Sequence, residues 1–482
     1  MNMALVFSLL GTIVLVEAVS MVPSLLIALI YGDGDAMVFV YSILATAAAG
    51  LVMRLLAKPK DRMLRGREGF TVVALSWIVL SAFGALPFLL SGFLPNFVDA
   101  LFESVSGFTT TGATVLSSFD WMPHGIVFWR SFTHWVGGMG VLVLTLALLP
   151  KLSDRSAHLV RAESPGPSLS KIAPKMGDNA KYLYYIYAAL TLLEFICLLL
   201  CGLNPYDAAL HALGTAGTGG FSNYSASIAA FNSVAVEAVM TVFMILFGVN
   251  FALYYFLISR SWRELRQNEE IRWYLGITFG CMLVITLMLL PVYHTFGEAF
   301  RYASFQTASI LSTSGFATAN FDLWPVNVKM LMFIMLFIGS SAGSTAGGIK
   351  VVRIALLLKQ GRREIRRTFQ PRKVEMIRFD GKGVDDHMLH QISVFGFVYI
   401  ALVLLGSLLI GLEGKYDMIT NLTAALTCVS NVGPGFGAVG PAGGFAGYGW
   451  FAKVICSFLM LAGRLELFPL LILFYPSVWR KT

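Results

Sequence analysis

Charged side chains are scarce in this chain, and their scarcity restricts the class of protein it can be. Only 13% of its 482 residues are Asp, Glu, Lys or Arg, whereas 57% are apolar. A typical soluble domain carries about 25% charged residues. This balance excludes a large soluble core and predicts an all-α polytopic membrane protein.

Enzyme motifs are also missing. The chain has no HExxH, no convergent Ser/His/Asp set, and seven scattered histidines. No GxGxxG follows a predicted strand, so we expect no nucleotide on this chain itself. The five cysteines lie in or beside apolar segments without metal-ligand spacing, which indicates buried thiols. We therefore expect a protein that is not an enzyme.

Long apolar segments, in contrast, are abundant, and about 20 such residues suffice to cross a bilayer. Ten spans are predicted, at about 3–31, 36–57, 69–93, 126–150, 181–203, 231–259, 273–293, 325–358 (interrupted), 390–412 and 447–476. Lys and Arg cluster in alternate connections, with 9 in 359–382 but only Arg301 and Lys415 in the intervening ones. The positive-inside rule then predicts a multi-pass membrane protein with both termini cytoplasmic.

Four short Gly/Thr/Ser-rich stretches lie between these spans, at 106–115, 214–223, 312–321 and 430–439. Each follows a segment of 10 to 15 residues, too short to cross and suited to a re-entrant half-helix. These half-helices are predicted at 96–106, 205–214, 298–312 and 416–429. Non-helical backbone is not tolerated in lipid, so the four turns must face one another or water.

The pattern predicts four span–pore-loop–span repeats in a pseudo-fourfold arrangement plus an N-terminal two-helix hairpin. The expected divisions are 1–67 for the hairpin, then 68–175, 176–268, 269–385 (with the interrupted second helix) and 386–482 for the repeats. Aligned on one glycine each, the turns place Gly112, Gly219, Gly315 and Gly433 in register.

Such turns offer backbone carbonyls and hydroxyls, the neutral oxygens that replace water around a monovalent cation. The filter residues predicted are Thr110, Thr111, Gly112, Thr218, Gly219, Thr313, Ser314, Gly315, Asn431, Val432 and Gly433. Acidic residues flank the turns: Asp99, Glu103, Asp120, Asp207, Glu298, Asp322 and Asp417. They either form a mouth that concentrates cations or simply cap helices and solvate the rim.

The repeats, their GFTTTGAT, GTGGFS, STSGF and SNVGPGFG loops and the extra hairpin resemble the TrkH-type subunit of the Trk/Ktr/HKT potassium transporters. The resemblance implies a potassium filter with one glycine per repeat, and Gly112 favours potassium because members with Ser there tend to pass sodium. It also implies a homodimer that contacts a cytosolic subunit binding NAD or ATP/ADP. The partner contacts expected are Lys350, Arg353, Arg362, Arg363, Arg366 and Arg367, with membrane lipid as a further partner and no nucleic acid.

Ten consecutive small residues, 339–348, interrupt the eighth span. They form either a tight helix crossing or, as the resemblance implies, an intramembrane gate below the filter, with Gly339, Gly343, Ser344, Thr345, Gly347 and Gly348 as its residues. Arg464 lies deep in the last span, where an unpaired charge costs about 2.5–3.5 kcal/mol. We expect it to face the pore near 339–348 as a barrier or latch, the alternative being a structural salt bridge.

The leading hypothesis is therefore gated, potassium-selective uptake through a central pore. The alternatives are a sodium-permeable pore, or an ion-coupled secondary transporter with its substrate site at the break. Discrete single-channel openings would favour the pore, and strict ion stoichiometry the transporter.

Overall fold

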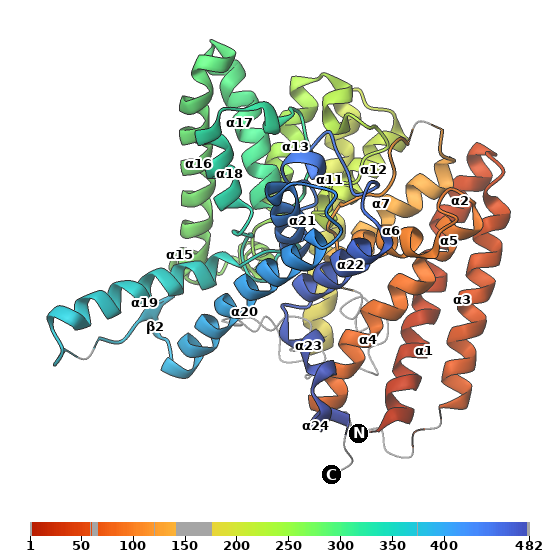
Figure 1. Ribbon diagram of the computed structural model, residues 1–482, viewed down its shortest axis with the longest axis horizontal. Coiled ribbons are helices and arrows are strands. Elements are labelled where there is room, and N and C mark those ends of the chain that lie inside the picture. Colours follow the sequence, from red (N-terminus) through yellow and green to blue (C-terminus); the bar gives the residue numbers. More distant parts are fainter. Residues whose placement is uncertain are drawn as a thin grey trace.

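The computed structural model describes residues 2–57, 59, 66–119, 121–140, 176–373 and 375–479. It is a bundle of helices in which the N-terminal hairpin lies at one edge and α16–α19 lie at the opposite edge (Figure 1). Both termini emerge on the same face of the bundle. The described strands are a single two-residue pair, β1 (Arg378–Phe379) and β2 (Lys382–Gly383).

The hairpin consists of α1 (Met3–Ser20), α2 (Val22–Tyr31) and α3 (Ala36–Leu56). Small residues let its helices approach closely, since a Cβ at Gly11 would lie 2.7 Å from the carbonyl oxygen of Gly50. Where α2 meets α3, Asp33 pairs with His124 at 2.6 Å. Hydrogen bonds from the backbone N–H and the ring of His124 hold the pKa of Asp33 below its usual value. The hairpin is thus attached at the edge of the repeats, as predicted.

Each of the following units contains a long helix, a short helix, a turn and a second helix. The first comprises α4 (Gly66–Gly84), α5 (Leu86–Leu90), α6 (Phe97–Phe108) and α7 (His124–Gly138). The second comprises α11 (Met176–Leu200), α12 (Pro205–Gly217), η1 (Ser227–Phe231), α13 (Val234–Phe247), α14 (Phe251–Ile258) and α15 (Trp262–Gln267).

The third comprises α16 (Glu269–Tyr293), α17 (Phe296–Leu311), η2 (Phe321–Leu323), α18 (Val326–Met335) and α19 (Val351–Phe369), followed by β1 and β2. The fourth comprises α20 (Asp386–Gly411), α21 (Met418–Ser430), η3 (Gly437–Val439), α22 (Trp450–Arg464), α23 (Phe468–Leu471), η4 (Ile472–Phe474) and α24 (Pro476–Trp479). The four-repeat architecture is the predicted one, while the exact division points stay predictions.

The short helices α6, α12, α17 and α21 begin close to where the sequence places them. Each has a polar N-cap whose side-chain oxygen accepts a backbone N–H of the first turn. The caps are Asn96, Asn204, Thr295 and Asp417. The N-caps satisfy backbone donors that would otherwise be left unpaired inside a membrane.

Six of the described helices are long and apolar enough to cross a membrane, or eight if two bent pairs each count as one span. The bends correct the sequence prediction of continuous spans at 231–259 and 447–476. The chain turns by 91° between α13 and α14, and by 119° between α22 and the segment Phe468–Phe474. At the first bend Asn250 caps the new helix, accepting the N–H of Ala252 at 2.9 Å. Part of the predicted span 126–150 lies outside the described residues.

Candidate ion pathway

The helices α6, α12, α17 and α21 all end in the same hydrogen-bonded turn. Just past each helix one residue adopts a left-handed backbone, with φ of 56°, 56°, 57° and 53° at Thr110, Thr218, Thr313 and Asn431. The next N–H returns to the carbonyl five positions earlier, at 2.9, 2.9, 2.9 and 3.0 Å. Four segments far apart in the sequence therefore share one local geometry.

A glycine with positive φ follows two positions after each of these residues. Its φ is 76° at Gly112, 78° at Gly220, 75° at Gly315 and 94° at Gly433. The register that aligned Gly219 with the other three is therefore one residue out in the second repeat. Two adjacent glycines look alike in a sequence, and only the backbone shows that the second one carries the left-handed conformation.

The four turns close into a ring. A Cβ added at any of the positive-φ glycines would lie against a carbonyl oxygen of another repeat. The pairs are Gly112 with Gly219, Gly220 with Ser314, Gly315 with Val432, and Gly433 with Thr111. These contacts run from the first repeat through the second, third and fourth and back to the first. We call residues 110–112, 218–220, 313–315 and 431–433 the glycine ring.

Uncharged oxygens surround the glycine ring, and its polar side chains are fully buried. The hydroxyls of Thr109 and Thr111 lie 2.8 Å apart, as do those of Ser312 and Ser314. The Asn431 amide donates to the Thr111 hydroxyl at 2.9 Å, which joins the fourth repeat to the first. Across the described ranges, no group of three or more His, Cys, Asp or Glu is placed to hold a metal. Carbonyl and hydroxyl oxygens of this kind suit a weakly hydrated monovalent cation.

The acidic residues predicted near the turns divide into two groups. Glu298 and Asp417 are exposed and Asp322 is half-buried, whereas Asp120 lies outside the described residues. Glu103 is instead fully buried, so it does not line an open mouth, one of the two roles considered for these carboxylates.

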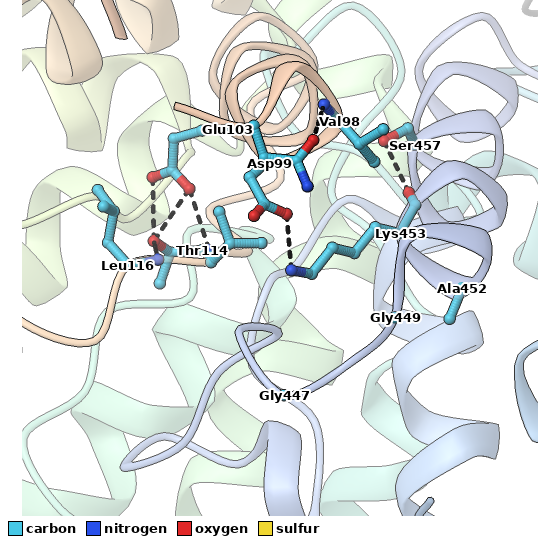
Figure 2. A network of polar contacts seen from close by, with 12 residues as sticks. Val98, Asp99, Glu103, Thr114, Leu116, Gly447, Gly449, Ala452, Lys453 and Ser457 are labelled. Carbon is cyan, nitrogen blue, oxygen red and sulfur yellow. Dashed lines mark hydrogen bonds and ion pairs between the residues drawn. The ribbon is translucent and has the colours of Figure 1, made fainter. Parts of the chain in front are cut away.

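Three of these acidic residues, Asp99, Glu103 and Asp207, bind protein groups. Glu103 pairs with Arg130 at 2.5 Å, and Asp99 meets Lys453 of α22 at 2.6 Å. Asp99 and Glu103 both lie on α6. Figure 2 shows Asp99 directed to Lys453 and Glu103 directed to Thr114. Asp207 accepts hydrogen bonds from Asn204, Asn223 and Tyr224. These carboxylates hold the loops together rather than facing solvent.

The 339–348 loop lies against the glycine ring. The Gly347 N–H donates to the Thr313 hydroxyl at 2.8 Å, and Ser340 donates to the Leu311 carbonyl at 2.8 Å. A Cβ at Gly347 would lie 2.8 Å from that of Asn431. The segment therefore contacts the glycine-ring residues of the third and fourth repeats. It does not form the tight helix crossing that the sequence left open as an alternative.

Arg464 joins this loop to the first repeat. Its guanidinium donates to the Thr345 carbonyl at 2.7 Å and to the carbonyls of Gly137 and Gly138 at 2.5 Å. Backbone carbonyls thus serve as the partners that a charge at this depth requires. Arg464 therefore lies near 339–348, as the sequence predicts. The partners described here are backbone carbonyls and not the carboxylate of the alternative, a structural salt bridge. A cavity of about 140 Å³ adjoins the loop, and Arg464, Lys350, Glu466 and Trp77 are among its lining residues.

Two of the residues predicted to contact a partner are buried instead. Lys350 donates to the Ala346 carbonyl and Arg353 pairs with Glu466, with exposures of only 6% and 5%. Both stabilise the 339–348 region from within, so we correct their assignment to a docking surface. The remaining predicted contacts lie on the later part of α19, where Arg362, Arg366 and Arg367 are exposed and Arg363 is half-buried. A hydrogen bond to Asp386 raises the pKa of Arg363.

Three residues of this region were not identified from the sequence. Gly220 was passed over in favour of its neighbour, and Arg130 and His134 were not among the predicted site residues. The His134 ring stacks on Phe221 at 4.0 Å, and Gly219 packs against it. The i, i+4 spacing of Arg130 and His134, which puts both on one face of α7, is the signal that was available, but it does not reveal which turn the side chains face.

Four re-entrant helices whose turns meet in one ring define a pore-loop membrane protein with pseudo-fourfold symmetry. Comparison with known proteins makes the class specific, because residues 35–481 match the family described as TrkH, cation transport protein. The chain belongs to this family.

Its relatives resemble it along their full length. The Trk system potassium uptake protein TrkH of Halomonas elongata is 36% identical, with 100% of both chains covered. The protein of the same name from Escherichia coli K12 is 38% identical, with 98% of each covered. The crystal structure of the potassium transporter TrkH from Vibrio parahaemolyticus superposes with a TM-score of 0.89 at 34% identity, covering 100% of both chains.

Proposed function

We propose that this protein takes up potassium across the bacterial inner membrane through a central pore whose filter is the glycine ring. The observation that carries the proposal is the closed cycle of backbone contacts from Gly112 through Gly220, Gly315 and Gly433. Positive φ at all four glycines orients successive peptide groups alike, so that four sets of carbonyls can surround one dehydrated ion. Relatives named as potassium uptake proteins support potassium as the ion.

The 339–348 loop is the gate of this pore in our proposal. It lies directly against Thr313 and Asn431, and its small residues leave its backbone free to change conformation. Arg464 holds it closed by binding Thr345 on one side and Gly137 on the other. Displacement of the loop and release of these carbonyls would open a path to the cavity beside Arg464.

Regulation in this proposal comes from other chains. The name Trk system, borne by the relatives, is consistent with several components, and we propose a homodimer with a cytosolic nucleotide-binding subunit. Arg362, Arg366 and Arg367 of α19 are its contact candidates, because α19 continues directly from the gate loop and projects from the bundle (Figure 1). The basic loops support cytoplasmic termini, by the positive-inside rule.

Growth of a bacterium that lacks potassium uptake tests the function. The wild-type chain should restore growth at low external potassium, and Gly112→Ser should weaken the preference for potassium over sodium. A serine Cβ would meet the Gly219 carbonyl and would be strained at a φ of 76°. Failure of the wild type to support growth, although membrane fractions contain it, would contradict the proposal.

A further inference from the structure

A buried ion pair lies behind the filter in the first half of the ring. The Arg130 Nε atom of α7 lies 2.5 Å from the Glu103 Oε1 atom of α6. Their side chains are 3% and 0% exposed. A buried pair is weak evidence for stability, because removing two charges from water offsets much of their attraction. A role in positioning the filter loops explains the pair better. The contacts of Glu103 and of Arg130 each support this role.

Glu103 holds the first filter loop. Both of its carboxylate oxygens accept from the Thr114 hydroxyl at 3.0 Å, and Oε2 also accepts the Val115 N–H at 3.1 Å. Thr114 lies two residues after Gly112. The carboxylate therefore fixes the segment that leaves the glycine ring, with charge-assisted bonds that are stronger than neutral ones.

Arg130 holds the second filter loop. Its Nη1 atom donates to the Ser222 carbonyl at 3.0 Å, and its guanidinium lies 3.5 Å from the centre of the Phe221 ring. Phe221 directly follows Gly220. One planar group thus binds a carboxylate of the first repeat and the backbone of the second, a geometry that suits arginine and not lysine.

The position of Glu103 is occupied by an uncharged side chain in each of the other repeats. Nine residues before the positive-φ glycine, where the first repeat has Glu103, the other repeats have His211, Gln306 and Ala424. His211 contacts the Ser222 hydroxyl at 3.0 Å. In the fourth repeat the neighbouring Thr423 accepts the Phe436 N–H at 3.0 Å. The same structural position therefore carries a charged support in the first repeat and neutral supports in the others.

We infer that the Glu103–Arg130 pair is a positioning device that sets the spacing of the first two filter loops and thereby the discrimination between potassium and sodium. The inference rests on the proposed function. The two charges cancel behind the ring, so an ion in the filter experiences little net field from them. Removal of the carboxylate leaves a cation facing the second loop, whereas exchange of Arg130 for lysine preserves the charge and loses the planar contact.

Potassium and sodium flux through purified protein in liposomes, with reversal potentials from bilayer recordings, tests this inference. Glu103→Gln should lower potassium flux about tenfold, the size of the loss of one charge-assisted hydrogen bond. Arg130→Lys should retain most of the flux and shift the potassium-to-sodium permeability ratio by roughly threefold to tenfold. Because Arg130→Lys keeps the buried charge, it remains testable if Glu103→Gln fails to fold, as judged by gel filtration and thermal melting.

The matched control is a second Glu–Arg pair between repeats. Arg301 of α17 binds Glu237 of α13 at 2.7 and 2.6 Å, and this pair joins two helices instead of a filter loop. Glu237→Gln should change the permeability ratio by less than about twofold. An unchanged ratio in folded Arg130→Lys, or an equal shift in the control, would overturn the inference alone. Absence of potassium flux in the wild type would overturn the proposed function and the inference with it.

Discussion

The glycine ring and the adjoining layer, which contains the 339–348 loop and the ends of the second helices, are built from the same four repeats. The ring has nearly the same backbone geometry in every repeat, whereas the adjoining layer differs from repeat to repeat. In the ring, the left-handed residue has φ between 53° and 57° in every repeat, and the hydrogen bond that follows varies by only 0.1 Å. In the adjoining layer, the second helices diverge. The described part of α7 ends at Gly138, the chain bends by 91° after α13 and by 119° after α22, and α18 gives way to a loop.

If the ring is the filter and the loop the gate, as we propose, this difference reflects the separate requirements of ion binding and of gating. An ion enclosed by four segments contacts all of them at once, so each must present the same atoms at the same distance. Obstruction of a path needs only one segment, and the other three then serve as its supports. Gly248 accepts a hydrogen bond from the Ser341 N–H, Gly137 accepts one from Arg464, and Arg464 itself comes from the fourth repeat.

The largest effect is expected from a substitution that changes the backbone of the glycine ring in the second repeat. Gly220→Ala should reduce potassium uptake to the level of cells without the protein, because the new Cβ meets the Ser314 carbonyl and φ is 78°. Gly219→Ala combined with His134→Ala should retain uptake, since Gly219 has no positive φ and the atoms nearest to its Cβ position belong to the His134 ring. Uptake of radioactive rubidium by intact cells measures both variants.

These two variants also decide the register. If Gly219→Ala with His134→Ala abolished uptake and Gly220→Ala did not, then Gly219 would be the filter glycine, as its sequence alignment first indicated. Equal amounts of both variants in the membrane, measured by immunoblotting, are the control for expression.

A second prediction concerns the loop itself. Arg464→Met should raise potassium flux about tenfold, because the loop loses the charge-assisted bonds from Arg464 that hold Thr345 near Gly137. Arg464→Lys keeps a charge at this position and should raise the flux less. Deletion of residues 340–347 should raise it as well. Flux through proteoliposomes is the measurement.

The outcome separates a gate from a scaffold. A folded, inserted Arg464→Met protein with unchanged flux would show that the loop does not limit conduction. Reduced flux in both Arg464→Met and the deletion would instead assign the segment to the stability of the pore.

Local signals explain how much of this architecture the sequence could predict. The four short helices were predicted to within about three residues of their observed bounds, because polar caps and glycine turns act over a few positions. The bends were not predicted, since glycine alone does not specify one. Gly276 and Gly280 lie within the continuous helix α16, whereas Gly248 lies at a bend where it contacts Tyr274 and Ser340.

The burial of several charged residues at the site could not be predicted, because their partners lie far away in the sequence. For Glu103 the sequence left an open mouth and a helix-capping role as alternatives, because its sequence neighbours suit either role. The residue that neutralises it, Arg130, is 27 positions away, and Ser222 is 92 positions beyond that. The burial of Lys350 and Arg353 likewise depends on Ala346 and Glu466 and not on the basic composition of the segment that follows them.

The smallest expected effect tests whether ring and loop are coupled. Thr313→Val removes the hydroxyl that accepts the Gly347 N–H at 2.8 Å and conserves volume, so it should raise flux by about threefold to tenfold, the equivalent of one neutral hydrogen bond. Thr218→Val is the matched control, because Thr218 has the same left-handed backbone but its hydroxyl donates to the adjacent Gly217 carbonyl. Open probability in single-channel recordings measures the change. Equal shifts in both variants would mean that the hydroxyls act on conduction within the ring, and a shift confined to Thr313→Val would mean that the loop is locked through its contact with the third repeat.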